Sequence, residues 1–151
     1  MARSRGMERL ADVYGVVERM RSVDVQVATG LMTEADGMCV KERQARDSEM
    51  VRGRAALAAG DSAGWVISEA ERRAAEARLG QLVDLQRQRR VVCEDARNAH
   101  TASRINVEQV QRVLDQARGQ QELVEQRRGQ AESDDRFASQ QCWQRKKLGQ
   151  H

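Results

Sequence analysis

Apolar residues in the first forty positions of the chain recur at alternating steps of three and four. The series consists of Leu10, Val13, Val17, Met20, Val27, Leu31 and Met38, with Asp24 and Glu34 at the two remaining positions of the repeat. A strict seven-residue repeat of this kind is typical of a coiled-coil seam, whereas a helix on a globular core shows a broader apolar stripe. The pattern predicts a first helix over about residues 7–58.

The one cluster of turn-forming residues has the sequence GDSAGWVI and occupies residues 60–67. Gly60 is suited to end the first helix in a left-handed conformation. Ser68, followed three residues later by Glu71, has the spacing of a capping box that opens the next helix. The sequence therefore predicts a tip loop at residues 60–67 and a second helix over about residues 68–147.

The apolar positions of the second helix fall into two stretches. The first stretch holds Leu79, Leu82, Leu85, Val92, Ala96 and Ala99, and the second holds Val107, Val110, Leu114, Ala117, Val124 and Ala131. The steps from Ala99 through Ser103 to Val107 insert an extra four-residue spacing, which predicts a stutter that locally relaxes the supercoil.

Two helices joined by a short loop return antiparallel. We therefore expect one all-α domain over residues 1–151, an elongated antiparallel two-helix coiled-coil hairpin with a longer second helix. The first helix should pair with roughly residues 68–120 and leave the C-terminal part unpaired. A hairpin centre near residues 64–66 would bring Cys39 to within about one turn of Cys93.

Composition supports this fold class. The chain has 151 residues, of which 40% are hydrophobic, 32% charged and only 3% aromatic, and it contains no proline. Long exposed helices with a narrow apolar seam have this composition, and compact globular cores do not. The net charge of +3 reflects basic ends around a balanced middle, so we expect no nucleic-acid binding.

The sequence lacks the motifs of an enzyme. It has no phosphate-binding loop, zinc-protease motif or nucleophile elbow, and its two histidines are His100, near the seam, and the terminal His151. We expect no catalytic residue, cofactor or metal site. No apolar run is long enough for a transmembrane segment. Three cysteines without a CxxC pair favour a reducing compartment and therefore the cytoplasm.

The C-terminal string EQRRGQAESDDRFASQQCWQRKK, residues 125–147, resembles the end of the stalk proteins of type III secretion systems, the FliJ/YscO family. Its Arg-rich helix and the acidic-basic patch of Asp134, Asp135 and Arg136 carry the resemblance, together with the chain length, the proline-free hairpin and Trp65 at the tip. The resemblance implies a cytoplasmic stalk protein held at the cytoplasmic face of the inner membrane through the secretion apparatus.

The resemblance also implies partners and site residues. A stalk of this family binds the hexameric type III secretion ATPase, promotes its assembly and activity, links it to the export gate protein and can escort secretion chaperones. The implied ATPase-binding residues are Arg127, Arg128, Asp134, Asp135, Arg136 and Phe137, and Trp65 is the implied tip contact with the export gate. Early in the second helix, where the family contacts the gate, this sequence has Glu71, Ala75 and Arg78 and no apolar patch.

Two other classes of protein fit the pattern. A prefoldin-like holdase chaperone is also a helical hairpin, with apolar residues exposed at its helix ends and usually an added strand platform. A structural coiled-coil dimer would pair in parallel through the second helix. The stalk interpretation predicts a monomer or weak self-association.

Overall fold

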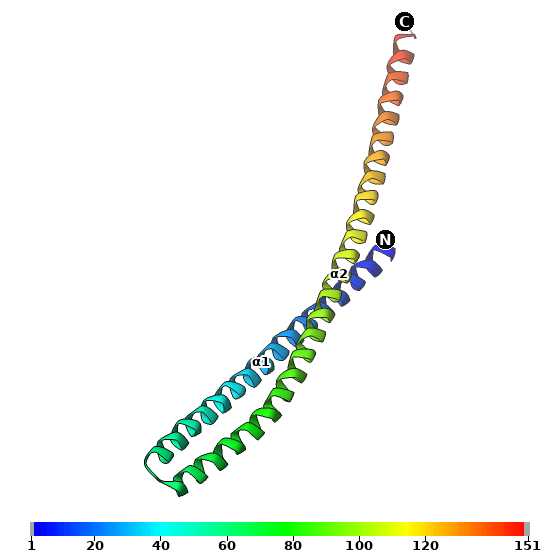
Figure 1. Cartoon of the computed structure of the whole chain (residues 1–151). Coiled ribbons are helices and arrows are strands. Elements are labelled where there is room, and N and C mark those ends of the chain that lie inside the picture. The colour runs from blue at the N-terminus through cyan, green and yellow to red at the C-terminus, as the bar shows by residue number, and fades with distance from the viewer. Residues whose placement is uncertain (1, 150–151) are drawn as a thin grey trace. The chain divides into compact units, whose positions relative to one another are not determined.

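The chain folds as two long α-helices joined by a tight turn. The computed structural model describes the backbone of residues 2–149 and the side chains of residues 5–149. Helix α1 spans Ala2–Ala58 and helix α2 spans Ser62–Leu148, and the described residues contain no strand. The all-α hairpin with a longer second helix is therefore confirmed (Figure 1).

The contacts divide the chain into two compact units. The hairpin unit consists of Val16–Arg104, and the terminal unit consists of Met1–Gly15 together with Ile105–His151. Neither helix, over the described residues, has a stretch that is both long and apolar enough to cross a membrane.

The turn of the hairpin unit is a Schellman motif followed directly by a new helix cap. Gly60 has a φ of 72°, as the sequence predicts, and its N–H donates to the carbonyl of Leu57 at 3.2 Å. The N–H of Asp61 donates to the carbonyl of Ala56 at 2.9 Å, which completes the motif. The Asp61 side chain then accepts the N–H of Gly64 at 2.9 Å, as an N-cap residue does.

This cap moves the start of α2 six residues upstream of the predicted capping box. Residues 62–67, predicted as loop, are helical. Ser68 is not a cap residue but lies inside α2, where it is buried. An aspartate directly after the glycine that ends one helix can complete the Schellman motif of that helix and cap the start of the next one. The two helices are therefore joined without a longer loop.

Each helix of the hairpin unit turns one heptad series toward its partner. The packed series of α1 consists of Glu18, Ser22, Val25, Ala28, Met32, Ala35, Cys39, Glu42, Arg46, Glu49, Gly53 and Ala56; Thr29, Leu31 and Asp36 beside it are also half-buried. The packed series of α2 consists of Ser68, Arg72, Ala75, Leu79, Leu82, Gln86, Arg89, Cys93, Ala96, His100 and Ser103, in unbroken steps of four and three; Gly64, Glu69, Val83, Leu85 and Ala99 beside it are also half-buried. The stutter predicted after Ala99 is therefore wrong, because the series passes from Ala96 through His100 to Ser103 without an extra four-residue step.

The packed series of α1 lies one residue beyond the predicted seam. The most deeply buried side chains are small: Ala35, Cys39, Ala75 and Cys93 are at most 1% exposed. In contrast, Val27 of the predicted seam is 57% exposed. Small side chains let two helices approach closely, and the larger apolar residues then lie to the side of the contact. The predicted α1 seam is thus wrong by one position.

Cross-helix pairs fix the antiparallel register. Thr29 Oγ1 lies 3.7 Å from Cys93 Sγ, and Glu18 Oε1 lies 2.8 Å from His100 Nε2. Cys93 therefore faces Thr29, and Cys39 lies ten residues, or about 15 Å of helix, further along α1. The predicted proximity of Cys39 and Cys93 is wrong, because the hairpin turns at residues 59–61 and not at 64–66.

The terminal unit pairs the start of α1 with the middle of α2. Met7, Ala11 and Tyr14 of α1 are half-buried, as are Val107, Val110 and Ala117 of α2, while Leu114 is buried. Glu8 and Arg118 form an ion pair at 3.4 Å. Every described residue from Gln120 to Gly149 is exposed, so this part of α2 has no packing partner within the described chain.

Candidate protein-binding interface

The exposed segment 120–149 of α2 is held together by local interactions. Arg128 pairs with Glu132 at 3.3 Å, and Gln130 Nε2 donates to Asp134 Oδ1 at 3.1 Å, both at four-residue spacing. The last turn carries Arg145, Lys146 and Lys147, which complement the helix dipole. Each pair stabilises a helix by only about 0.2–0.5 kcal/mol. A helix of this kind gains most from a surface that covers one of its faces.

The six ATPase-binding residues expected from the sequence all lie in this segment. They are Arg127, Arg128, Asp134, Asp135, Arg136 and Phe137, and all are exposed. The helix brings Arg127 and Asp134 onto one face, seven residues apart, and Arg128 and Asp135 onto the adjacent face. Arg136 points to the side opposite Arg127, about 180° around the axis, so a single flat partner cannot contact all six.

An apolar stripe in this segment adds Leu123 and Leu148 to Phe137, which the sequence already predicts. Leu123 and Phe137, with Gln130 midway between them, lie at seven-residue intervals and share one face with Leu148. Their exposed fractions are 53% for Leu123, 63% for Phe137 and 78% for Leu148. The spacing is present in the sequence, but the predicted seam continues through Val124 and Ala131 on the adjacent face.

A cation–π contact marks the end of the same segment. Lys147 Nζ lies 4.1 Å from the centroid of the Trp143 ring. The contact lies one turn from the C-terminal end of α2, where a positive charge also favours the helix dipole.

Trp65, the expected tip contact, lies in the first turn of α2. The backbone N–H of Trp65 donates to the backbone carbonyl of Asp61 at 3.2 Å, and the residue is 37% exposed. Cδ1 of the indole would lie 3.7 Å from a Cβ atom placed on Gly53, so the ring packs over the glycine of α1. Beside it, Leu57, Val66 and Ile67 are 59%, 58% and 64% exposed. The tip thus presents an apolar patch of which the sequence reasoning named only Trp65.

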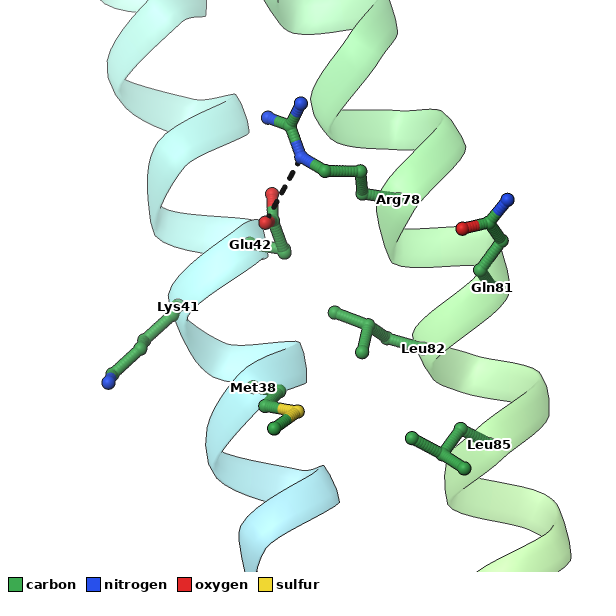
Figure 2. A pocket seen from close by; sticks show the side chains of 7 residues that line it. All are labelled: Met38, Lys41, Glu42, Arg78, Gln81, Leu82 and Leu85. Carbon is green, nitrogen blue, oxygen red and sulfur yellow. Dashed lines mark hydrogen bonds and ion pairs between the residues drawn. The ribbon is translucent and has the colours of Figure 1, made fainter.

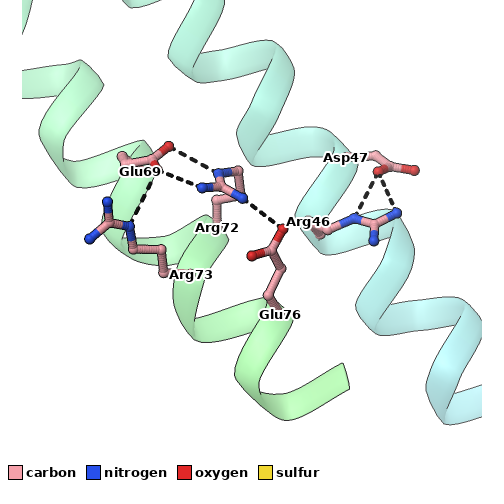
Figure 3. Close-up of polar contacts among 6 residues, drawn as sticks. All are labelled: Arg46, Asp47, Glu69, Arg72, Arg73 and Glu76. Atoms are coloured by element: carbon pink, nitrogen blue, oxygen red, sulfur yellow. Dashed lines mark hydrogen bonds and ion pairs between the residues drawn. The ribbon is translucent and has the colours of Figure 1, made fainter. Parts of the chain in front are cut away.

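An ionic cluster follows the tip on α2 (Figure 3). Arg72 donates to both oxygens of Glu69, at 2.6 and 2.9 Å, and to Glu76 at 2.6 Å, while Arg73 donates to Glu69 at 3.3 Å. These hydrogen bonds, above all those of Arg72, lower the pKa of Glu69 to about 2. The same pairing raises the pKa of Arg72. The cluster stays charged at physiological pH and stiffens the first turns of α2.

A groove lies beside the seam in the middle of the hairpin unit (Figure 2). Figure 2 shows Met38 of α1 and Leu82 and Leu85 of α2 directed into the space between the helices. The groove has a volume of about 500 Å³. Arg78 Nε donates to Glu42 Oε1 at 3.1 Å at one end, and Lys41 extends away from the helix contact.

Two polar contacts cross the seam in the hairpin unit: His100 pairs with Glu18, and Gln86 donates to Asp36, each linking α2 to α1. Among residues 5–149 no group of three or more His, Cys, Asp or Glu side chains could hold a metal ion. Cys39 and Cys93 are buried, and Cys142 is an exposed free thiol.

No protein-family model, curated protein or solved structure matches the chain. The geometry thus defines a class of structure, a helical hairpin with an uncovered C-terminal helix.

Proposed function

We propose that the protein is a cytoplasmic stalk of a type III secretion system that binds the hexameric secretion ATPase through residues 120–149. One observation carries this proposal: every described residue of that segment is exposed although it forms continuous helix. A partner that covers one face of the segment would supply the tertiary packing that a lone helix lacks.

The segment combines an apolar anchor with fixed charges. Phe137 and Leu123 provide large apolar side chains on one face, and buried aromatic residues commonly dominate the energy of a protein interface. Arg127 with Asp134, and Arg128 with Asp135, place both signs of charge on the two neighbouring faces. Such patterns steer association and set the register of a bound helix. In this role the stalk promotes assembly and activity of the ATPase ring.

The tip supports the second part of the proposal. Trp65 and its exposed neighbours Val66 and Ile67 form an apolar surface at the turn of the hairpin unit. We assign this surface to the export gate protein, so that the stalk links the ATPase to the gate. Secretion chaperones are further candidate partners of the stalk.

Binding of the full chain to the purified secretion ATPase of the same organism tests the proposal. The double variant Leu123→Ala and Phe137→Ala should weaken binding at least tenfold, because it removes two exposed anchors at no cost to internal packing. Arg127→Glu with Arg128→Glu should weaken it as well, with a strong dependence on salt. The control is Arg97→Glu, at an exposed arginine of α2 in the hairpin unit, which should bind as the parent does.

The apolar tip also favours a second candidate function, that of a holdase chaperone. A holdase grips unfolded chains with exposed apolar residues at the ends of its helices, and Leu57, Val66 and Ile67 fit that description. Suppression of the aggregation of an unfolded model protein, lost in Val66→Ser with Ile67→Ser, would favour the holdase. Full ATPase binding by that variant together with no suppression by the parent would favour the stalk.

A further inference from the structure

Helix α1 carries a second heptad series that α2 does not cover. Within the hairpin unit it consists of Val17, Met20, Asp24, Val27, Leu31, Glu34, Met38 and Lys41. Each position of this second series comes one residue before a position that packs against α2, except Met20, which comes two residues before Ser22. The second series therefore lies about 100° around the helix axis from the seam. Most of its apolar members are open to solvent, with Met20 62% and Val27 57% exposed, whereas Leu31 is half-buried.

Two neighbouring apolar series on one helix are the pattern of a helix with two packing partners. A helix in a two-stranded coil needs only the narrow a/d seam, whereas a helix in a bundle shows a broader stripe. Helix α2 accounts for one series of α1. The second series would be covered by another helix that packs on the side of the hairpin unit where this series lies.

Helix α2 extends the apolar face on that side. Leu82 and Leu85 line the groove of about 500 Å³ with Met38, and Leu85 also lines a smaller cavity of about 70 Å³ with Leu31 (Figure 2). The face is therefore a shallow channel with α1 on one side and α2 on the other. An α-helix fits such a channel by setting its own apolar residues between the two.

The charges of the stripe are self-complementary. Its acidic members, Asp24 and Glu34, come earlier in α1 than its basic member, Lys41. Asp24 Oδ2 lies 3.6 Å from the guanidinium of Arg21 in an exposed ion pair. Lys41 forms no ion pair with any described residue. A second copy of the stripe running in the opposite direction would bring Asp24 of one copy to Lys41 of the other, with Glu34 near the middle of the stripe.

We propose that two copies of this chain associate through the stripe, with their α1 helices antiparallel, to form a four-helix bundle from two hairpin units. In the favoured register, Asp24 faces Lys41 of the second copy and Val27 faces Met38 of the second copy. The twofold symmetry repeats each pair, so two Asp–Lys pairs flank the contact. At its centre, Leu31 of each copy faces Glu34 of the other copy.

The neighbouring registers are worse on charge alone. A shift of one heptad in one direction sets Asp24 against Glu34 of the second copy, which places like charges together twice. A shift in the other direction sets Lys41 against Leu31 of the second copy and leaves Asp24 without a basic partner. Polar seam residues select register in this way at some cost in affinity.

This inference is independent of the proposed stalk function. The contact uses residues of the hairpin unit and none of residues 120–149. ATPase binding by a chain that stays monomeric would support the stalk and overturn the dimer, whereas a dimer without ATPase binding would do the reverse.

Sedimentation equilibrium of the full chain over a range of concentrations tests the dimer. The parent should show a reversible monomer–dimer equilibrium. Asp24→Lys or Lys41→Asp alone should raise the dissociation constant about tenfold, because each creates two like-charge contacts by symmetry. The combined Asp24→Lys and Lys41→Asp variant should return to within about threefold of the parent. Glu94→Lys, at an exposed position on the other side of α2, is the charge-matched control and should leave the constant unchanged.

Disulfide trapping tests the register. In a Cys142→Ser background, Val27→Cys combined with Met38→Cys should form a covalent dimer on mild oxidation. Val27→Cys alone should not, because its symmetry mate would lie about 16 Å away along the helix axis. A monomeric parent at every soluble concentration, or a double charge reversal that fails to restore association, would overturn the proposal.

Discussion

The glycine beneath Trp65 offers a direct test of the packing in the hairpin unit. Gly53 is a buried residue in the interior of α1, and an interior glycine costs a helix about 1 kcal/mol relative to alanine. A Cβ atom at this position would lie 3.6 Å from Ser68 Cβ and 3.7 Å from Trp65 Cδ1, both ordinary van der Waals distances. Gly53→Ala should therefore gain the helix propensity and bury a methyl group without displacing either neighbour.

The expected stabilisation of Gly53→Ala is about 1–2 kcal/mol, with the upper end including the buried methyl group. For a chain of this length, each kcal/mol corresponds to a rise in Tm of about 2–4 °C. Circular dichroism at 222 nm during thermal and urea denaturation, at one fixed protein concentration, measures both quantities.

Gly64 provides the matched contrast, because it is also a helical glycine near the tip. A Cβ atom there would overlap the carboxylate of Asp61, which caps α2 by accepting the Gly64 N–H. Gly64→Ala gains about 1 kcal/mol of propensity but displaces a cap of about the same value, so its net effect should be near zero. Destabilisation by Gly53→Ala, or equal stabilisation by both variants, would refute the described packing of the tip.

Three further predictions test other parts of the structure. Ala35→Leu should destabilise by about 1–3 kcal/mol in urea denaturation, since the parent side chain is 1% exposed in a seam of small residues; an unchanged midpoint would contradict the close packing. Because Arg72 lowers the folded-state pKa of Glu69 from 4.5 to about 2, the stabilisation by this carboxylate is present above about pH 4.5 and is lost as the pH falls toward 2. The stability of Glu69→Gln should therefore fall less steeply than that of the parent over this range, and parallel curves would count against the cluster. Deletion of residues 125–151 should abolish ATPase binding but keep most of the helical signal of the remaining chain, and full binding by the shortened chain would refute the placement of the site.

The sequence predicts the hairpin, its antiparallel direction and the left-handed Gly60, because these depend on local signals. It does not predict which face of α1 meets α2. Size and hydrophobicity favour Val27 and Met38, but the close approach of the helices selects Ala28 and Cys39, each one residue further along α1. That choice depends on the matching series of α2 and thus on tertiary contact.

The start of α2 shows a similar limit. Ser68 with Glu71 has the spacing of a capping box, yet Asp61 caps the helix earlier and leaves Ser68 buried in the seam. The spacing alone cannot rank two possible caps, because the Schellman turn decides where the chain is free to begin a helix. Of the candidate site, the sequence predicts the segment that carries the charges, and the structure adds the exposed face of Leu123 and Leu148.

We propose that the uncovered helix of residues 120–149 binds the secretion ATPase. Affinity purification of the tagged full chain from its native cytoplasm, with mass spectrometry of the recovered proteins, tests this binding when the double variant Leu123→Ala with Phe137→Ala is purified in parallel. We expect the hexameric secretion ATPase to be recovered with the parent and to be lost with the double variant. Recovery of assorted unfolded proteins, or of the chain alone, would contradict the proposal.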